Sequence, residues 1–440
     1  MPKVQSMRSR VAALFRYPPE VLLLADVALV LPTFEAPKNI LFGAWLAVWL
    51  LSRLKDGDWG GRWSRWDTLI VAWIASVVLS AAFAGTSHSE WRGCRDVARY
   101  TAVLWLLTRS NYDESAWKLI YGALMISVVV GTIWALVALA WPHDYLGIQL
   151  NSVGHVNDSM TYVAICFGVL LAALATYWQS LSRLIRAGGM AGLAILLVAV
   201  AIAGSRAAAV SLMVQALCFG ALWLRRSRVL FRYALLGVVV FAVLIVGLDT
   251  EIWRKQGWAS ETSHPVLGAR YPIWNQALLE WRMYPILGVG NTNFSQLRED
   301  EAEHWLVSRG EPYSDGMYAG SSHAHSLYLN TLAERGLVGL ASLFALLVAF
   351  GLSLLRGIPR VRDPAIHWLL WYGAASALLV TTGIGLVNTT LHSETALLAT
   401  LLIGAWLGYR RRTRPATATE ISSGRLVSSE DLEIARRVTL

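Results

Sequence analysis

Residues 116–140 read AWKLIYGALMISVVVGTIWALVALA, an apolar run in which Lys118 is the single charged residue. A helix needs about 20 mostly apolar residues to cross a bilayer, so this stretch predicts a membrane span. Runs of similar length and character recur along most of the chain. We predict twelve spans: 20–34, 38–54, 67–85, 94–109, 116–140, 157–178, 187–204, 206–224, 229–248, 326–355, 365–386 and 391–409.

The overall composition also fits an all-α integral membrane protein. The 440 residues are 55% hydrophobic and only 15% charged, whereas soluble domains carry about 25% charged residues. The net charge of +9 does not indicate nucleic acid as a partner, because most Lys and Arg residues stand in short clusters between apolar runs. The 21 Trp residues fit as well, since Trp gathers at membrane interfaces.

The basic clusters predict the orientation of the chain. Cytoplasmic loops of membrane proteins carry an excess of Lys and Arg. Placing both termini in the cytoplasm puts five basic clusters on that side, and the opposite loops 86–91, 141–156 and 387–390 are poor in Lys and Arg. These clusters are Arg53/Lys55/Arg62/Arg65, Arg183/Arg186, Arg225/Arg226/Arg228/Arg232, Arg356/Arg360/Arg362 and Arg410/Arg411/Arg412/Arg414.

The chain divides into five parts on this map. We expect an amphipathic cytoplasmic N-terminus at 1–19, nine spans in 20–248, an outer loop domain at 249–325, three spans in 326–409 and a polar cytoplasmic tail at 410–440. The outer loop is long, and loops of that length are usually functional. We predict a helix in it from Pro272 to Tyr284, with Ile273, Trp274, Ala277, Leu278 and Trp281 on one face toward the membrane interface.

Two arginines stand at predicted helix starts on the outer side. Gly204 suits the end of one helix and Ser205 the cap of the next, so Arg206 falls in a first helical turn. Arg270 lies just before the helix predicted from Pro272. Because a helix N-terminus is already positive, a cation there favours an anionic partner, and two such arginines could grip a diphosphate. The alternatives are a snorkelling Arg206 and a loop salt bridge from Arg270 to Glu261 or Glu280.

Three further arginines are candidates for the same anion site. Arg282 lies in the outer loop, and Arg95 and Arg99 share a face one turn apart at the outer end of the fourth span. Ionisable groups within a span usually face the protein interior or a polar cavity. Arg95 and Arg99 either extend the anion site or pair with Asp96 or another neighbour.

His325 is the candidate general base. It lies at the outer mouth of the span that follows, and a neutral imidazole suits proton abstraction near pH 7. Gly336 and Gly339 lie deeper in that span, where they would permit close helix contact. His323 is assigned to substrate binding. The alternatives are a structural histidine, or a metal bound by His323 and His325, although no Cys or Asp cluster accompanies that pair.

Several of these residues together resemble the O-antigen ligase family, which shares this region with O-antigen polymerases and pilin-type O-oligosaccharyltransferases. The resemblance rests on Ser205-Arg206, on Arg270 before a Trp-containing helix, and on Pro285-Ile-Leu-Gly288-Val-Gly290. Its most specific part is His325 followed by Ser326, then Gly336 and Gly339, where the family commonly has Asn after the histidine.

The resemblance implies a membrane glycosyltransferase of the GT-C class. Such ligases move a polymer from undecaprenyl diphosphate to lipid A-core at the periplasmic leaflet of the bacterial inner membrane, without metal or other cofactor. The implied partners are the lipid-linked O-antigen, lipid A-core and membrane lipids. His325 would deprotonate the acceptor hydroxyl, and the arginines would bind the diphosphate during an inverting transfer.

Three other functions remain open from the sequence. An O-antigen polymerase would use the same chemistry with a second lipid-linked sugar as acceptor. A protein O-oligosaccharyltransferase would use a pilin-like acceptor. A transporter of lipid-linked sugars would place its polar site near the bilayer midplane, whereas the candidate residues here gather at one face.

Overall fold

The computed structural model describes residues 17–84, 88–139, 147–223, 270–314, 316–319 and 321–413. Every regular element within these ranges is an α-helix. The helices are α2 (Pro19–Val30), α3 (Glu35–Asp56), α4 (Arg65–Phe83), α5 (His88–Arg109), α6 (Glu114–Ala138), α7 (Val156–Tyr177), α8 (Arg183–Ala203), α9 (Arg206–Trp223), α11 (Arg270–Met283), α12 (Glu299–Val307), α13 (Leu327–Arg356), α14 (Ala365–Ile384) and α15 (Ser393–Arg412).

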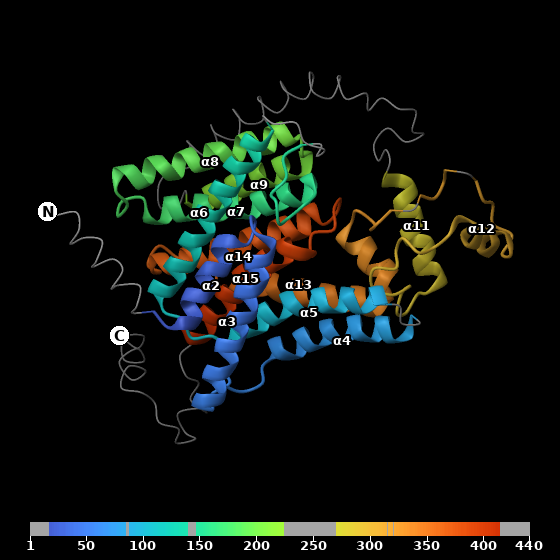
Figure 1. The fold of residues 1–440 in the computed structure, drawn as a ribbon, viewed down its shortest axis with the longest axis horizontal. Helices are drawn as coiled ribbons and strands as arrows, with labels where there is room; N and C mark the ends of the chain where they lie inside the picture. The colour runs from blue at the N-terminus through green and yellow to red at the C-terminus, as the bar shows by residue number, and fades with distance from the viewer. Residues whose placement is uncertain are drawn as a thin grey trace.

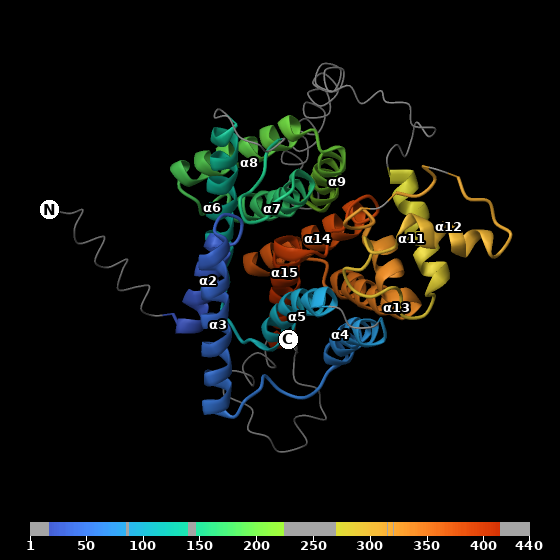
Figure 2. The same ribbon diagram turned by 45° about the vertical axis from the view of Figure 1, so that its right-hand side comes forward.

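Three helices form the centre of the bundle. α14 packs against both α7 and α15, and α15 also packs along α5. The remaining long helices surround this centre: α2 lies against α3 and α6, α4 against α5 and α13, and α9 against α7 and α14 (Figures 1 and 2). The starts of α7, α13 and α15 and the end of α14 meet at one end of the bundle, which we call the loop end. There the backbone N–H of Leu327 donates to Gly385 O and Asn388 O.

Within the described ranges, seven helices are long and apolar enough to cross a membrane: α4, α6, α7, α8, α9, α13 and α14. They coincide with seven of the twelve predicted spans, and the protein is an all-α membrane protein. α7 is apolar and largely buried by its neighbours, as expected for a central helix, whereas α8 is mostly exposed at the edge.

Four of the other predicted spans are helices that do not meet this standard, so the count of twelve is not supported. α2 has only 12 residues and covers about 18 Å at 1.5 Å per residue, which is short of a hydrocarbon core of about 30 Å. α3 and α15 are less apolar and end in basic residues, and α5 carries charges throughout its first half. The predicted span 229–248 lies outside the described residues, as do 249–269 of the outer loop.

The tight α8–α9 turn is as predicted. Gly204 is the C-cap of α8 with φ +64°, a left-handed conformation that costs glycine nothing. α9 then begins at Arg206. The predicted outer helix is also present as α11, although it begins two residues early, so Arg270 is its first residue instead of preceding it.

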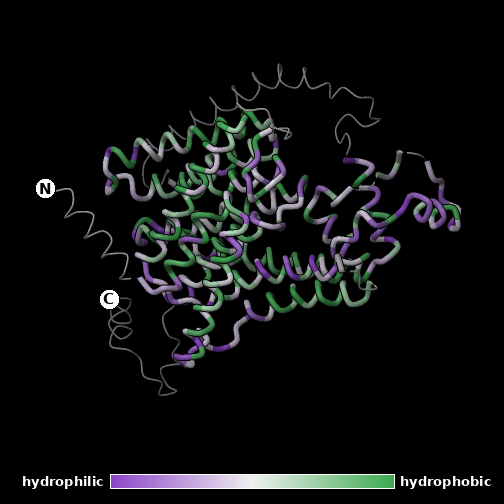
Figure 3. The backbone as a smooth tube through the Cα atoms, viewed as in Figure 1, coloured by the Kyte–Doolittle hydropathy of each residue, from purple (hydrophilic) through white to green (hydrophobic). Residues whose placement is uncertain are grey.

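α11 and α12 form a small unit beside the bundle, more hydrophilic than the helices it adjoins (Figures 1 and 3). Ala277 of α11 packs with Phe294, Ala324 and Ala333, and Leu279 packs with Ala302 and Leu306 of α12. The buried residues of α11 are Gln276, Ala277, Leu279 and Glu280, and α11 packs against α13, while Leu278 of the predicted apolar face is exposed. The contact of that face with the membrane interface stays a prediction.

A main-chain contact joins this unit to α13. Val289 N donates to Ala333 O and Gly290 N to Glu334 O, while Leu337 N donates to Pro285 O and Val338 N to Ile286 O, at 2.9–3.2 Å. α13 is kinked at this point, since Gly336 has φ +60° and ψ −159°. We call the pairing of 285–290 with 333–338 the backbone clasp.

Candidate active site

His325 stands at the entrance to α13 in a constrained turn. Its φ of +46° is left-handed, which is uncommon for a residue with a side chain. Buried groups hold it there. Ala324 N donates to Asn330 Oδ1 at 2.9 Å, and Leu329 N donates to Oγ of Ser326, the N-cap of α13, at 3.4 Å. Backbone strain that is fixed in this way is frequent at functional sites.

Polar side chains from three parts of the chain gather around His325. The ring of His323 lies 4.3 Å from that of His325, centroid to centroid. His155 and Asp158 come from the start of α7, and Asn388 from the α14–α15 connection; all three act electrostatically or by hydrogen bonding on His325. His392, just before α15, acts on His323 and Asp158. We call this set the histidine cluster: His155, Asp158, His323, His325, Asn388 and His392.

The environment keeps the two central histidines neutral. Burial is the largest cause that lowers the pKa of His325, followed by the positive charge of Arg270 and by His155, while Asp158 and Asn388 oppose the shift. Burial and the neighbouring histidines lower the pKa of His323 to about 4. At neutral pH both rings are therefore uncharged, which is the form that accepts a proton.

Arg270 is the predicted arginine that the fold brings to His325. It is half-buried as the first residue of α11, and burial lowers its pKa. None of the carboxylates in the described parts of the chain forms an ion pair with it. The alternative partner Glu280 is fully buried and hydrogen-bonded to Gln276, and burial raises the pKa of Glu280 to about 9. A helix start with a desolvated cation and neutral imidazoles suits an anionic group.

Arg206 lies at the same end of the bundle. α7 and α8 are joined by residues 178–182, and α8 and α9 by residues 204–205. The start of α9 therefore returns to the loop end, where α7 begins. The Arg206 side chain is exposed, and α9 packs against α7 and α14. The structure gives no direct contact between Arg206 and His325.

The remaining predicted arginines lie apart from His325. Arg282 is exposed and forms a two-bond ion pair with Glu311, with its guanidinium 5.2 Å from the centre of the Trp305 ring. Arg95 is exposed on α5. Arg99 takes the alternative left open from the sequence, because it pairs with Asp96 at 3.1 Å and lies 3.7 Å from Glu394.

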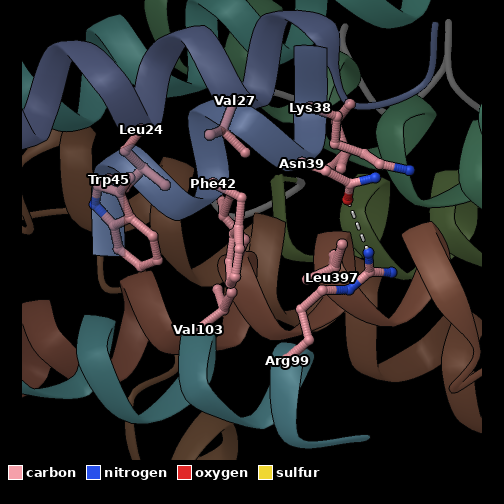
Figure 4. Close-up of a pocket in the computed structure, with 11 residues that line it drawn as sticks. Leu24, Val27, Lys38, Asn39, Phe42, Trp45, Arg99, Val103 and Leu397 are labelled. Atoms are coloured by element: carbon pink, nitrogen blue, oxygen red, sulfur yellow. Dashed lines mark hydrogen bonds between the residues drawn. The ribbon is translucent and has the colours of Figure 1, made fainter. Parts of the chain in front are cut away.

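Arg99 belongs to a second charged group at the loop end, built around the buried Lys38. Lys38 Nζ contacts Glu35 at 2.6 Å, Ser152 Oγ at 2.8 Å, and the carboxylate of Glu394. Figure 4 shows Lys38, Asn39 and Arg99 at one end of a pocket whose other walls are apolar, with Arg99 donating to Asn39. We call this group the Lys38 network: Glu35, Lys38, Asp96, Arg99 and Glu394. Its two cations face three carboxylates, so it offers no net positive charge to a phosphate.

The motif residues after His325 have structural roles. Ser326 caps α13 and also donates to Gly385 O at 3.4 Å. A Cβ on Gly336 would lie 2.3 Å from the backbone carbonyl of Ile286, and one on Gly339 would lie 2.2 Å from Cβ of Arg335. At Gly336 the close approach is therefore to the segment that follows α11 and not to a neighbouring helix. The glycines permit the kink and the backbone clasp, because the chain bends back on itself there.

Sequence reasoning missed part of the cluster. No role is predicted from the sequence for His155, Asp158, Asn388 or His392. An ionisable Asp158 at the start of an apolar span was a usable signal, but nothing local marks Asn388. No group of three or more His, Cys, Asp or Glu side chains in the described ranges is arranged to hold a metal.

Comparison with known families gives one match. The model of the family described as O-antigen ligase matches residues 191–344. These residues run from α8 into α13 and include Arg206, Arg270 and His325. No curated protein matches the chain.

Proposed function

From the premise that the chain belongs to the O-antigen ligase family by its residues 191–344, we propose that it transfers a polysaccharide from undecaprenyl diphosphate to a hydroxyl of lipid A-core. The family supports a ligase or polymerase type of function on lipid-linked polysaccharide. The donor, the acceptor and the roles of individual residues are our proposal. It includes a GT-C-type architecture and a metal-independent, inverting reaction.

The observation that carries the proposal is the proximity of Arg270 to a neutral His325 inside the matched region. A neutral base and a desolvated cation that act on each other electrostatically are what a transfer from a diphosphate requires. The base activates the acceptor, and the cation binds the leaving group.

The proposed reaction has one substitution step. His325 accepts the proton of the acceptor hydroxyl, and the resulting oxygen nucleophile attacks the anomeric carbon of the donor sugar. The bond from that carbon to the diphosphate oxygen breaks on the opposite face, so the configuration inverts. Undecaprenyl diphosphate leaves with the bonding electron pair, and Arg270 with Arg206 stabilises its negative charge. The proton on His325 then passes to water.

The proposed location follows from the distribution of charge along the chain. With both termini in the cytoplasm, the loop end of the bundle and the outer loop domain 249–325 face the periplasm from the bacterial inner membrane. The lipid tails of donor and acceptor then stay in the bilayer while their sugars meet at the loop end.

Substituting His325 by alanine tests this function. The purified protein is reconstituted with undecaprenyl-diphosphate-linked polysaccharide and lipid A-core, and the joined product is measured. We expect the His325→Ala variant to lose transfer by about 10²–10⁴-fold, the usual contribution of a general base, with donor binding retained. Wild-type turnover in this variant would remove His325 from the reaction.

Two controls make the test specific. His304 is an exposed histidine on α12 of the same outer loop, so His304→Ala should transfer normally. Replacing lipid A-core by a second lipid-linked sugar separates ligase from polymerase. Product with that acceptor alone would reassign the protein as a polymerase with the same catalytic groups.

A further inference from the structure

Asn388 is tied to both sides of the histidine cluster. Its side chain is buried, and its Nδ2 donates to Asp158 Oδ1 at 3.0 Å. Its backbone oxygen accepts from Leu327 N at 3.1 Å, two residues after His325. Its side chain also acts on His325 in the sense that raises the pKa of the imidazole.

The direction of these bonds defines a chain of three groups. The amide nitrogen of Asn388 donates to Asp158, and the amide oxygen is the atom of that side chain that can accept an N–H from His325. The order is therefore imidazole, amide, carboxylate. The carboxylate comes from α7, more than 150 residues earlier in the sequence, and the amide from the loop after α14.

We propose that Asn388 and Asp158 are positioning residues for His325, fixing the tautomer and the orientation of the imidazole that takes up the acceptor proton. This inference rests on the proposed function. Neither residue touches the reacting atoms.

The physical reason lies in the two nitrogens of the ring. An amide oxygen that accepts from one ring N–H fixes the proton there, so the other nitrogen keeps its lone pair for the acceptor hydroxyl. When His325 becomes charged, the carboxylate of Asp158 favours that charge across the amide. The same logic governs the aspartate that orients the histidine in serine hydrolases.

A structural reading of Asp158 predicts something different. An acidic residue in the first turn of a helix stabilises that helix through its dipole, and Asp158 stands in the first turn of α7. That role needs no partner at Asn388 and does not change the proton affinity of His325. The pH dependence of His325 protonation therefore distinguishes the positioning role of Asp158 from the purely structural one.

The charges around His325 fix the sign of the expected shift. In the described part of the chain, Arg270 from α11 and His155 from the start of α7 disfavour its charged form, and His323 lies against it. Asp158 and Asn388 favour the charged form. Removing either of these two lowers the pKa of His325, so the acid limb of the pH–rate profile moves to lower pH.

The first measurement is transfer activity of Asp158→Asn and Asn388→Ala across pH. We expect kcat to fall on the order of 10–100-fold, the size found when a partner that orients a histidine ligand is removed. KM for the donor should stay the same, and the acid half-point should move down in both variants. Asp300→Asn is the matched control, because Asp300 is an exposed residue of α12 paired with Arg298.

The second measurement does not depend on activity. Diethyl pyrocarbonate modifies neutral imidazole, and peptide mass spectrometry reports the modification of His325 separately from that of His323. The pH dependence of this rate should move to lower pH in both variants and stay unchanged in Asp300→Asn.

The outcomes separate the two proposals. A wild-type protein that transfers no sugar to either acceptor would end the proposed function, and the positioning role with it. An active wild type with an unshifted His325 titration in both variants would overturn the positioning role alone. A shift in Asp158→Asn without one in Asn388→Ala would also overturn it, because the chain requires the amide.

Discussion

The histidine cluster and the Lys38 network are two charged regions that meet at the start of α15. His392 belongs to the first and Glu394 to the second, with Ser393 between them donating its backbone N–H to Asp96 Oδ2 at 3.3 Å. In the Lys38 network every cation is paired: Lys38 with Glu35 and Glu394, and Arg99 with Asp96. In the histidine cluster the neighbouring Arg270 is desolvated, and none of the described carboxylates pairs with it.

This difference distinguishes charges that hold helices together from charges that can receive a substrate. A buried cation that is already paired with carboxylates has no charge free to bind a phosphate. Removing that cation leaves the carboxylates without their counter-charge. A desolvated cation beside neutral rings gains from an arriving anion. Three substitutions test this division.

Lys38→Met should produce the largest loss of stability. Lys38 is 1% exposed, and its removal leaves the buried carboxylate of Glu394 with only the more distant Arg99, 3.7 Å away, as a counter-charge. Removing one partner of a buried pair costs about 3–5 kcal/mol. Thermal unfolding in detergent micelles measures the effect. Lys118→Met is the control, since the Lys118–Glu114 pair is about half exposed and such pairs contribute about 0–1 kcal/mol. Equal shifts of the unfolding temperature in the two variants would contradict the idea that the Lys38 network stabilises the fold more than an exposed ion pair does.

Arg270→Gln should affect binding more than stability. Hydrogen bonds to charged groups contribute about 1.5–3 kcal/mol, which corresponds to roughly a 10–100-fold rise in KM for the diphosphate donor. Steady-state transfer assays at varied donor concentration measure this, with the exposed Arg298→Gln as control. A large loss of stability with unchanged KM would place Arg270 among the structural charges.

Arg282→Ala should have the smallest effect. Arg282 is exposed and engaged by Glu311 and the Trp305 ring on the outer unit, so donor KM and transfer rate should match the wild type. A change in donor KM comparable to that of Arg270→Gln would return Arg282 to the binding site.

The sequence predicted which segments form helices better than it predicted which side chains lie next to one another in space. Apolar length identified α6 and α13 because a span leaves a local signal. The same criterion is not supported at α2, which has only 12 residues, or at α5, which carries charges through its first half. The motif around His325 predicted a resemblance to the O-antigen ligase family, and the model of that family matches residues 191–344.

The surroundings of His325 could not be predicted in the same way. Asp158 and Asn388 are 230 positions apart in sequence, and their contact depends on how α7 and α14 pack. Arg99 and Arg270 looked alike as arginines at the ends of helices. Only the fold shows that Asp96 and Glu394 pair with Arg99, while Glu280 turns away from Arg270 into the outer unit.

The backbone clasp has a consequence for how this region tolerates change. Its four hydrogen bonds join main-chain groups only, so most side chains in 285–290 and 333–338 can be exchanged without losing a bond. Gly288 and Gly336 are the exceptions, because a methyl group at either would collide with the opposite backbone. Register is a stricter constraint, since one inserted or deleted residue would misalign every bond at once. Length should therefore vary less than composition across this junction.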